Sequence, residues 1–124
     1  MTDVRIVLVG LGNLGRRFCE VVAAREEMLA SRYGLRFVLV GAADSRGAAY
    51  DAAGLDMMEV ARLKREGGSV ADVPGVGRPG WGAVELVETA EADALLEASP
   101  VNLDQGAEPA LTCIRRAMAK GMHV

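Results

Sequence analysis

The stretch Val4–Gly15, with the sequence VRIVLVGLGNLG, decides the fold of this chain. Its first six residues are apolar except for Arg5, and four of the six are Val or Ile. Such a run is typical of a strand buried on both faces of a parallel sheet. The spacing Gly10-x-Gly12-x-x-Gly15 follows at once. Apolar residues at helical intervals come next, namely Leu14, Phe18, Val21, Val22, Met28 and Leu29. The stretch therefore predicts a strand, a glycine turn and a helix in succession.

Each glycine of this turn has a physical reason to be there. Gly10 lets the chain leave the strand in a tight turn, and Gly15 lets the helix pack closely against the strand. Gly12 has no side chain, so a pyrophosphate can approach the backbone and face the N–H groups at the helix start, with Asn13 as N-cap. The alternative is a glycine-rich turn that binds nothing. The position between a buried strand and an amphipathic helix favours a dinucleotide site.

Composition sets limits on the class of protein. The chain has 124 residues, 51% of them hydrophobic, and a net charge of −3 with no basic block. One domain of ordinary size is expected, and nucleic-acid binding has little support. The first apolar run is too short for a signal peptide or a membrane span. Cys19 and Cys113 are expected to pack as small apolar residues inside helices, in a reducing compartment such as the cytoplasm. With a single histidine, His123, no metal site is predicted.

A second apolar run, Arg36–Ala42, predicts another strand and completes a right-handed βαβ unit whose long helix ends at Gly34. Asp44, Ser45 and Arg46 follow this strand directly. In dinucleotide folds an acid at this place accepts hydrogen bonds from the adenosine ribose, and a nearby Arg accommodates a 2′-phosphate. The alternative is an Asx turn at Asp44 with a solvated Arg46.

The remaining chain predicts shorter elements and a second βα unit. The first of these are a helix over Leu55–Arg65 ended by Gly67–Gly68, a loop over Val73–Gly82 with Trp81 as core cover, and a short helix over Ala83–Ala92. A strand over Asp93–Ala98 and a loop from Ser99 follow. A helix then opens at Glu108-Pro109, with Leu111, Ile114 and Met118 buried, and a last strand begins at Met122. That last strand has only three residues, which leads us to expect a fragment of a longer protein, cut within a strand.

The predicted fold class is therefore α/β, a Rossmann-type doubly wound parallel sheet that is truncated at its fifth strand. The expected strand order is 3-2-1-4-5, with the ligand at the switch point between the first and fourth strands. Residues 1–124 are expected to form one dinucleotide-binding domain, without a substrate domain.

Several runs of the sequence resemble one enzyme family. They are VGLGNLGRRF, GAADSRG, GLD, LLEASPVNL and IRRAMAKGMHV, of which the loop Glu97–Asn102 with the following Glu108–Ala110 is the most specific. Together they resemble the N-terminal cofactor-binding domain of homoserine dehydrogenase. The resemblance implies an oxidoreductase of amino-acid biosynthesis, on the route to threonine and methionine. Its reaction is the conversion of homoserine to aspartate semialdehyde or the reverse, with hydride transfer to or from NAD or NADP.

The resemblance also implies roles for individual residues. Carried over by position, they are Gly10, Gly12, Asn13, Leu14 and Gly15 at the pyrophosphate, Asp44, Ser45 and Arg46 at the adenosine ribose, and Ala98, Ser99, Pro100 and Asn102 at the nicotinamide side. No residue here matches the catalytic lysines and substrate-binding acids of the family. The chain alone is thus expected to be inactive, and its parent to bind a small-molecule substrate and form a homo-oligomer. The alternatives are another Rossmann dehydrogenase, such as aspartate dehydrogenase, or a non-catalytic nucleotide-sensing module.

Overall fold

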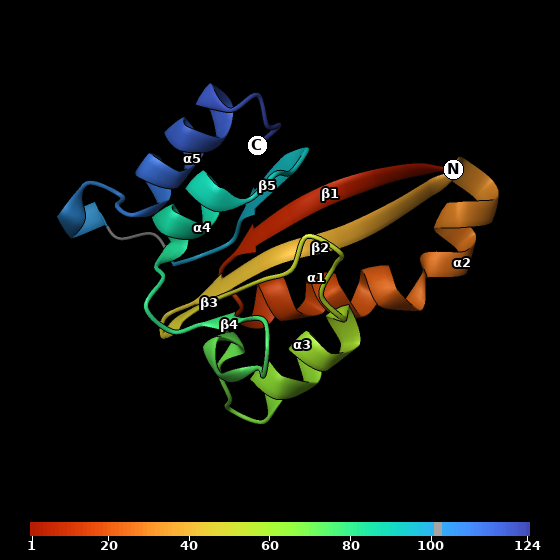
Figure 1. The fold of residues 1–124 in the computed structure, drawn as a ribbon, viewed down its shortest axis with the longest axis horizontal. Helices are drawn as coiled ribbons and strands as arrows, with labels where there is room; N and C mark the ends of the chain where they lie inside the picture. Colours follow the sequence, from red (N-terminus) through yellow and green to blue (C-terminus); the bar gives the residue numbers. More distant parts are fainter. Residues whose placement is uncertain (101–102) are drawn as a thin grey trace.

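A five-stranded sheet with helices on both faces forms the protein (Figure 1). This computed structural model describes residues 1–100 and 103–124. The strand order is β4-β3-β2-β1-β5. The strands are β1 (Thr2–Val9), β2 (Leu35–Asp44), β3 (Gly47–Tyr50), β4 (Gly77–Arg78) and β5 (Ala94–Glu97). Strand β1 pairs in parallel with β2 on one side and with β5 on the other, which is the predicted βαβ arrangement.

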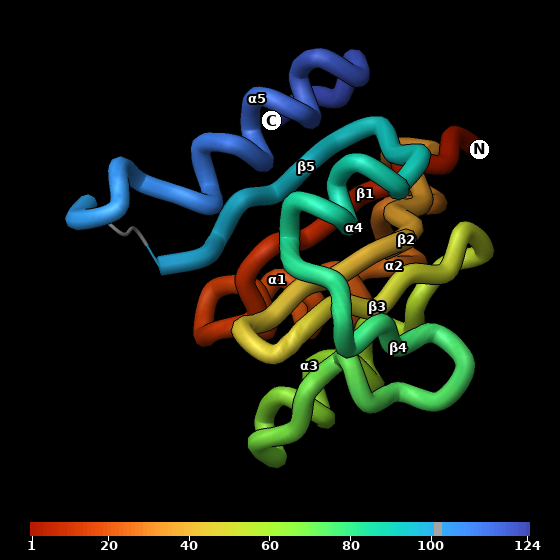
Figure 2. The backbone as a smooth tube through the Cα atoms, turned by 60° about the vertical axis from the view of Figure 1, so that its left-hand side comes forward, coloured from red at the N-terminus to blue at the C-terminus, as the bar shows by residue number. Residues whose placement is uncertain are grey.

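The helices cover the two faces in pairs (Figures 1 and 2). They are α1 (Asn13–Ala24), α2 (Glu26–Met28), the π-helix η1 (Leu29–Tyr33), α3 (Met57–Arg65), α4 (Ala83–Thr89) and α5 (Ala110–Ala119), with short 3₁₀ turns η2 (Val70–Asp72) and η3 (Leu103–Gln105). Helices α1 and α3 lie on one face, and α4 and α5 on the other. Each face has its own buried cluster, because the apolar residues of β1 point alternately to either side.

The predicted fold class is confirmed, but the sheet is not parallel throughout. Strands β2 and β3 form an antiparallel hairpin, and β4 pairs antiparallel to β3. Only Ser45 and Arg46 separate β2 from β3, and a parallel connection needs a crossover of a dozen residues or more. The hairpin was not predicted, because the Gly-Ala-Ala-Tyr sequence of β3 has low strand propensity.

Most predicted helices and their ends are confirmed. The first helix continues through α2 and η1 to Gly34, which has a φ of 64° as the C-cap. Helix α3 begins after its N-cap Asp56, and α4 is the short helix expected within Ala83–Ala92. Trp81 packs against the buried cluster on the α4 side, with its ring centroid 6.4 Å from that of Tyr50.

Three expectations about side chains are wrong. Leu14, Val21 and Met118 are 71%, 41% and 62% exposed, although their spacing predicted burial. The buried lines of α1 and α5 instead run through small residues, Gly15 and Cys19 in one and Cys113 and Ala117 in the other. Small side chains let both helices lie close to the sheet, which leaves the larger neighbours outside. The N-cap of α1 is also Gly12 rather than Asn13, whose Oδ1 accepts a hydrogen bond from Arg16.

The end of the chain lies beside β5. Met122 is buried, and His123 forms a parallel bridge with Ala94. The Leu95 N–H donates to the His123 carbonyl at 2.8 Å, and the His123 N–H donates to the Asp93 carbonyl at 2.9 Å. A segment thus begins to pair on the outer side of β5, which is the position predicted for a fifth strand.

Candidate functional site

The carboxyl ends of β1, β2 and β5 meet at one edge of the sheet. Two hydrogen bonds tie them together there. The Gly10 N–H donates to the Ala43 carbonyl at 2.9 Å, and the Ala98 N–H donates to the Val9 carbonyl at 2.7 Å. In open α/β sheets, ligands bind in the crevice outside such strand ends, at the switch point beside the first strand. The residues predicted to bind the cofactor therefore share one edge.

The three glycines of the turn at this edge differ in what surrounds them. Gly10 has a φ of +102°, and a Cβ added to it would lie 2.5 Å from the backbone of Ala98 and Ser99. A Cβ on Gly15 would lie 2.0 Å from the Gly10 carbonyl oxygen. Gly12 differs from both, because a Cβ there would have no atom within 4 Å. Its glycine is not required by packing, so it leaves space at the start of α1.

Asp44 ends β2 with its carboxylate almost enclosed. Its side chain is 3% exposed and accepts hydrogen bonds from four groups. The Arg46 N–H and the Ser69 hydroxyl donate to Oδ1 at 2.9 and 3.0 Å, and the Val70 N–H and the Lys64 ammonium donate to Oδ2 at 2.9 and 3.1 Å. A carboxylate has about four acceptor positions, so these donors use its capacity.

The surroundings of Asp44 change its acidity in two opposing ways. Burial alone would raise its pKa. Hydrogen bonds from Val70, Arg46, Lys64 and Ser69 outweigh burial, and the pKa lies below its usual value. The group is therefore held as an anion, and it joins the turn after β2 to the segment after α3.

The two residues after Asp44 lie in the β2–β3 turn and are exposed. The bond from the Arg46 N–H closes the Asx turn that was the alternative interpretation of this stretch. The Arg46 side chain is not fully solvated, because its Nη2 donates to the Gly67 carbonyl at 2.7 Å. The guanidinium is thus held near the rim of the same edge, and Ser45 lies exposed beside it in the turn.

The end of β5 holds a second carboxylate, that of Glu97. Its Oε1 accepts from the Ser99 N–H at 2.8 Å and also from the Ser99 hydroxyl. Its Oε2 is buried and has no hydrogen-bond partner among the described residues. Ala98 and Ser99 are half-buried beside the glycine turn, and Pro100 is exposed. The predicted Asn102 lies outside the described residues.

The first turn of α5 borders this end of β5. The Glu108 carboxylate accepts from the Thr112 N–H and hydroxyl at 3.1 and 2.6 Å, and these bonds lower its pKa. Burial, and then the charges of Glu97, Glu108 and Glu85, raise the pKa of Cys113 to about 11. Cys113 is therefore a packed thiol rather than a reactive one. Cys19 is equally enclosed, and burial raises its pKa to about 11 as well.

Three residues that contribute to the edge were missed from the sequence. Lys64 and Ser69 hold Asp44 from 20 and 25 residues further along the chain, and no local pattern announces such contacts. Glu97 was part of the family-like motif but received no role. The available signal was its place as a charged residue at the end of an apolar strand.

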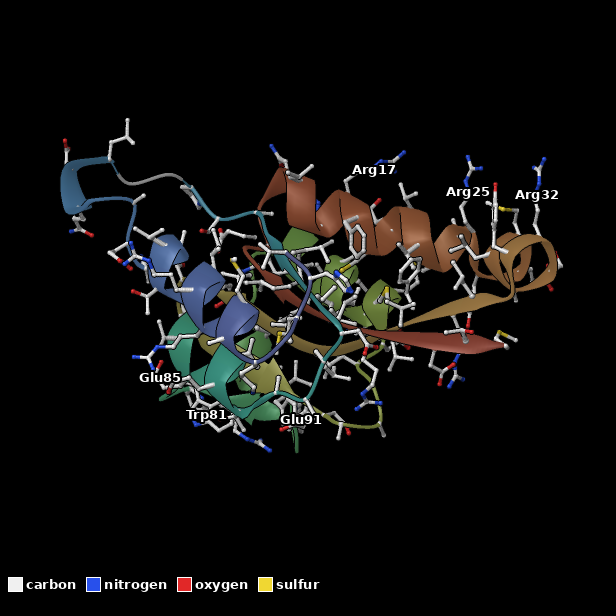
Figure 3. The ribbon with its side chains drawn as sticks, turned by 90° about the horizontal axis from the view of Figure 1, so that it is seen from above. Arg17, Arg25, Arg32, Trp81, Glu85 and Glu91 are labelled. Carbon is white, nitrogen blue, oxygen red and sulfur yellow. The ribbon has the colours of Figure 1, made fainter. Side chains whose placement is uncertain are left out.

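Other features lie away from this edge. Cavities of about 460 and 430 Å³ adjoin the first half of β2 and the segment between α3 and residue 76. Arg17, Arg25 and Arg32 project from the outer side of the first helical segment (Figure 3). Within residues 1–100 and 103–124, no helix is long and apolar enough to cross a membrane, and no three metal-binding side chains cluster.

The strand order, the glycine turn and the helices on both faces define a Rossmann-type α/β domain. No protein-family model matches the chain. A homoserine dehydrogenase from Methanocaldococcus jannaschii is 31% identical over 119 residues, which are 96% of this chain and 34% of that protein. An NAD(+)-dependent homoserine dehydrogenase from Pseudomonas canavaninivorans is 31% identical over 130 residues, which cover 100% of this chain and 35% of that protein. Over nearly its whole length the chain is therefore similar to homoserine dehydrogenases, and it spans about a third of the length of these relatives.

Solved structures agree with this relationship. Homoserine dehydrogenase from Thermoplasma acidophilum matches with a TM-score of 0.73 at 27% identity, over 98% of this chain and 34% of that one. A hyperthermophilic archaeal homoserine dehydrogenase mutant in complex with NADPH matches with a TM-score of 0.78 at 19% identity, over 98% of this chain and 34% of that one. The second likeness supports the fold alone.

Proposed function

We propose that this chain is the cofactor-binding part of a homoserine dehydrogenase, and that it binds NAD or NADP at the carboxyl edge of its sheet. The open space at Gly12, at the N-cap of a helix of 12 residues, carries this proposal. Helix N-termini present free N–H groups and a positive dipole to phosphate. A glycine with no packing reason in such a place fits a ligand that approaches the backbone. When bound, the cofactor would supply hydride transfer.

The rest of the turn is expected to hold the pyrophosphate between the two halves of the cofactor. The exposed backbone around Asn13 and Leu14 lies on the first turn of α1, and Gly15 keeps that turn against the strand. The adenosine half would then lie toward β2, and the nicotinamide half toward Ala98, Ser99 and β5. Both halves of the cofactor would thus contact strand ends that the hydrogen bonds described above join.

The adenosine end is where the two cofactors differ. The contact predicted between Asp44 and the ribose remains a prediction, and the four donors that its carboxylate already accepts weigh against it. Arg46 keeps donor positions free in its five-donor fork after bonding Gly67. We therefore propose that Arg46 contacts a 2′-phosphate and that NADP gains more than NAD from this end.

The relatives support a proposal for the activity of the whole enzyme. We propose that the parent protein interconverts homoserine and aspartate semialdehyde in the cytoplasm, as a homo-oligomer. This chain spans about a third of its relatives, and its described residues include no candidate catalytic lysine at the edge other than Lys64, which is bound to Asp44. The chain alone is expected to bind the cofactor without turning over homoserine.

Calorimetry with NAD and with NADP tests the proposal, using the 124-residue chain and its Gly12→Val variant. Ligand at about 100 times its dissociation constant should stabilise the wild type by roughly 2.7 kcal/mol in a thermal shift. The valine should fill the open space and abolish binding, while the fold survives because Gly12 has a φ of −75°. Gly80→Val is the matched control, since Gly80 also has no neighbour within 4 Å of an added Cβ and lies in the loop before α4. Unchanged binding by a folded Gly12→Val variant would place the pyrophosphate elsewhere.

A further inference from the structure

The Glu97 carboxylate accepts hydrogen bonds at one of its two oxygens. Its Oε1 accepts two hydrogen bonds from Ser99, and its Oε2 is buried without any partner among the described residues. Among the buried side-chain nitrogen and oxygen atoms of the described residues, Oε2 of Glu97 is the one that has no hydrogen-bond partner. An oxygen that has lost water and gained no donor is unfavourable, by about 1–3 kcal/mol for a neutral group and more for a charged one.

The neighbours of Glu97 do not supply the missing donor. Glu97 pairs with Val9 across the sheet and lies on the α4 and α5 side, where Val9 and Leu95 are buried. On α5, the hydroxyl and N–H of Thr112 are bound to Glu108. Lys120 donates its three hydrogen bonds to carbonyl oxygens at the end of α4. These polar groups of α5 are therefore committed elsewhere, and the Cys113 thiol, which feels the charge of Glu97, makes no hydrogen bond to Oε2.

The position of Glu97 at the end of β5 indicates which half of a bound dinucleotide would lie close to it. Glu97 is the last residue of β5, and the loop that follows touches Gly10 so closely that no side chain fits between them. The glycine turn and the end of β5 therefore border one continuous surface. A dinucleotide with its pyrophosphate at Gly12 and its adenosine toward β2 directs its other half to β5. Both the ribose and the carboxamide of that half carry hydrogen-bond donors.

We propose that Glu97 binds the nicotinamide riboside half of the cofactor, with Oε2 accepting a hydrogen bond from a ribose hydroxyl or from the carboxamide N–H. This inference rests on the proposed function. Ser99 holds Oε1 and thereby orients the carboxylate. Because Oε2 is buried in the chain without ligand, the contact requires a local shift at the end of β5 when the cofactor binds. Glu97 is then a binding residue that also selects for a complete nicotinamide dinucleotide over its adenosine half.

The test measures dissociation constants by calorimetry for four ligands that differ at one end. ADP carries only the adenosine half, and ADP-ribose adds the second ribose. NAD adds the nicotinamide, and 3-acetylpyridine adenine dinucleotide replaces the carboxamide with a group that lacks the N–H. Each is titrated into the wild-type chain, Glu97→Gln and the control Glu85→Gln. Glu85 also lies near Cys113, but its carboxylate is bound to the Gly82 N–H at 3.0 Å.

Glu97→Gln keeps an acceptor for Ser99 and replaces Oε2 with an amide N–H₂, which cannot accept. We expect its affinity for NAD to fall about 10- to 100-fold, the size of a lost hydrogen bond to a charged group. Its affinity for ADP should stay within about twofold of the wild type. If the ribose hydroxyl is the donor, ADP-ribose loses as much as NAD. If the carboxamide is the donor, ADP-ribose and the acetylpyridine analogue are insensitive to the variant.

Two results would overturn the inference while leaving the proposed function intact. One is an equal loss for ADP and NAD in Glu97→Gln, which would mean a structural effect. The other is no loss for any ligand. If no ligand binds to the wild-type chain, the proposed function and this inference both fail. Should Glu97→Gln not fold, the ¹³C resonance of the Glu97 carboxyl in the wild-type chain decides. It should shift with NAD and not with ADP, and a resonance that ignores NAD refutes the contact.

Discussion

Asp44 and Glu97 end two strands that flank β1, yet their carboxylates are used differently. Asp44 closes β2 and receives four protein donors, spread over both of its oxygens. Glu97 closes β5 and, among the residues that the structure describes, receives donors on one oxygen, while the other is buried without a partner there. Both stand at the edge where dinucleotides bind in this class of fold.

This difference indicates which carboxylate at the edge can still accept a hydrogen bond from a ligand. A saturated carboxylate stabilises the fold, because each of its acceptor positions already replaces a lost contact with water. A half-saturated one leaves a favourable hydrogen bond to be gained on binding. We therefore propose that Asp44 serves the structure of this edge beside β2, and that Glu97 serves recognition of the ligand at the end of β5.

Among these predictions, the loss of stability on replacing Asp44 is the greatest. Asp44→Ala should destabilise the protein by about 3–5 kcal/mol, because it leaves the Lys64 charge with 14% exposure and without its partner. Urea unfolding measures this change. Asp51→Ala is the control, since within the described part of the chain the Asp51 carboxylate accepts a single hydrogen bond, from the Ala53 N–H. Glu97→Gln should stay within about 1 kcal/mol of the wild type. An equal loss of unfolding free energy in the Asp44 and Glu97 variants would contradict the different roles of the two carboxylates.

An intermediate effect concerns the charge that remains at the adenosine end. Arg46→Ala should weaken NADP binding by about 1.5–3 kcal/mol, the range of a hydrogen bond to a charged group, and should change NAD binding little. Calorimetry with both cofactors at one salt concentration measures the difference. Arg32→Ala is the control, because Arg32 precedes β2 and Arg46 follows it, so the two lie beyond opposite ends of that strand. The Arg32 side chain projects outward from the helical segment (Figure 3). Equal losses for NAD and NADP would leave Arg46 as a hydrogen-bonded residue of the turn.

The smallest effect is a pH dependence that isolates Asp44. Its pKa is lower in the folded protein than the value of about 3.9 in an unfolded chain. The resulting stabilisation is complete above the unfolded pKa and is lost as the pH falls through the folded pKa. The free energy of unfolding should therefore drop more steeply below about pH 4 in the wild type than in Asp44→Asn. Parallel curves for the two proteins in urea would show that Asp44 carries no such stabilisation.

The sequence predicted the parts of this molecule that depend on local pattern. The apolar run of β1, the glycine turn and the end of the first helix at Gly34 follow from burial, backbone freedom and helix termination. The order of the parallel strands β2, β1 and β5 is the one expected for a Rossmann-type sheet. These rules act over a few residues or over one supersecondary unit, so they could be applied without coordinates.

What the sequence could not predict depends on contacts between distant segments. The β3 hairpin consists of small residues that fit beneath Ala71, where a Cβ on Gly47 would lie 2.7 Å from the Ala71 Cβ. The saturation of Asp44 depends on Lys64 and Ser69, which only the folded chain brings together. The unpaired oxygen of Glu97 is likewise a property of packing, since the same residue on a surface would be solvated.

The chain has two lysines, Lys64 and Lys120, and the ammonium group of each donates hydrogen bonds to other groups of the protein. Lys64 donates to Asp44 and to the Gly68 carbonyl, and Lys120 donates to three carbonyls at the end of α4. An amine-reactive label must break these bonds before either nitrogen can act as a nucleophile. In the native protein the reagent should therefore modify the amino terminus first, so a single-site conjugate can be made without mutating the chain. Lysine labelling then becomes a chemical signal that the fold has opened.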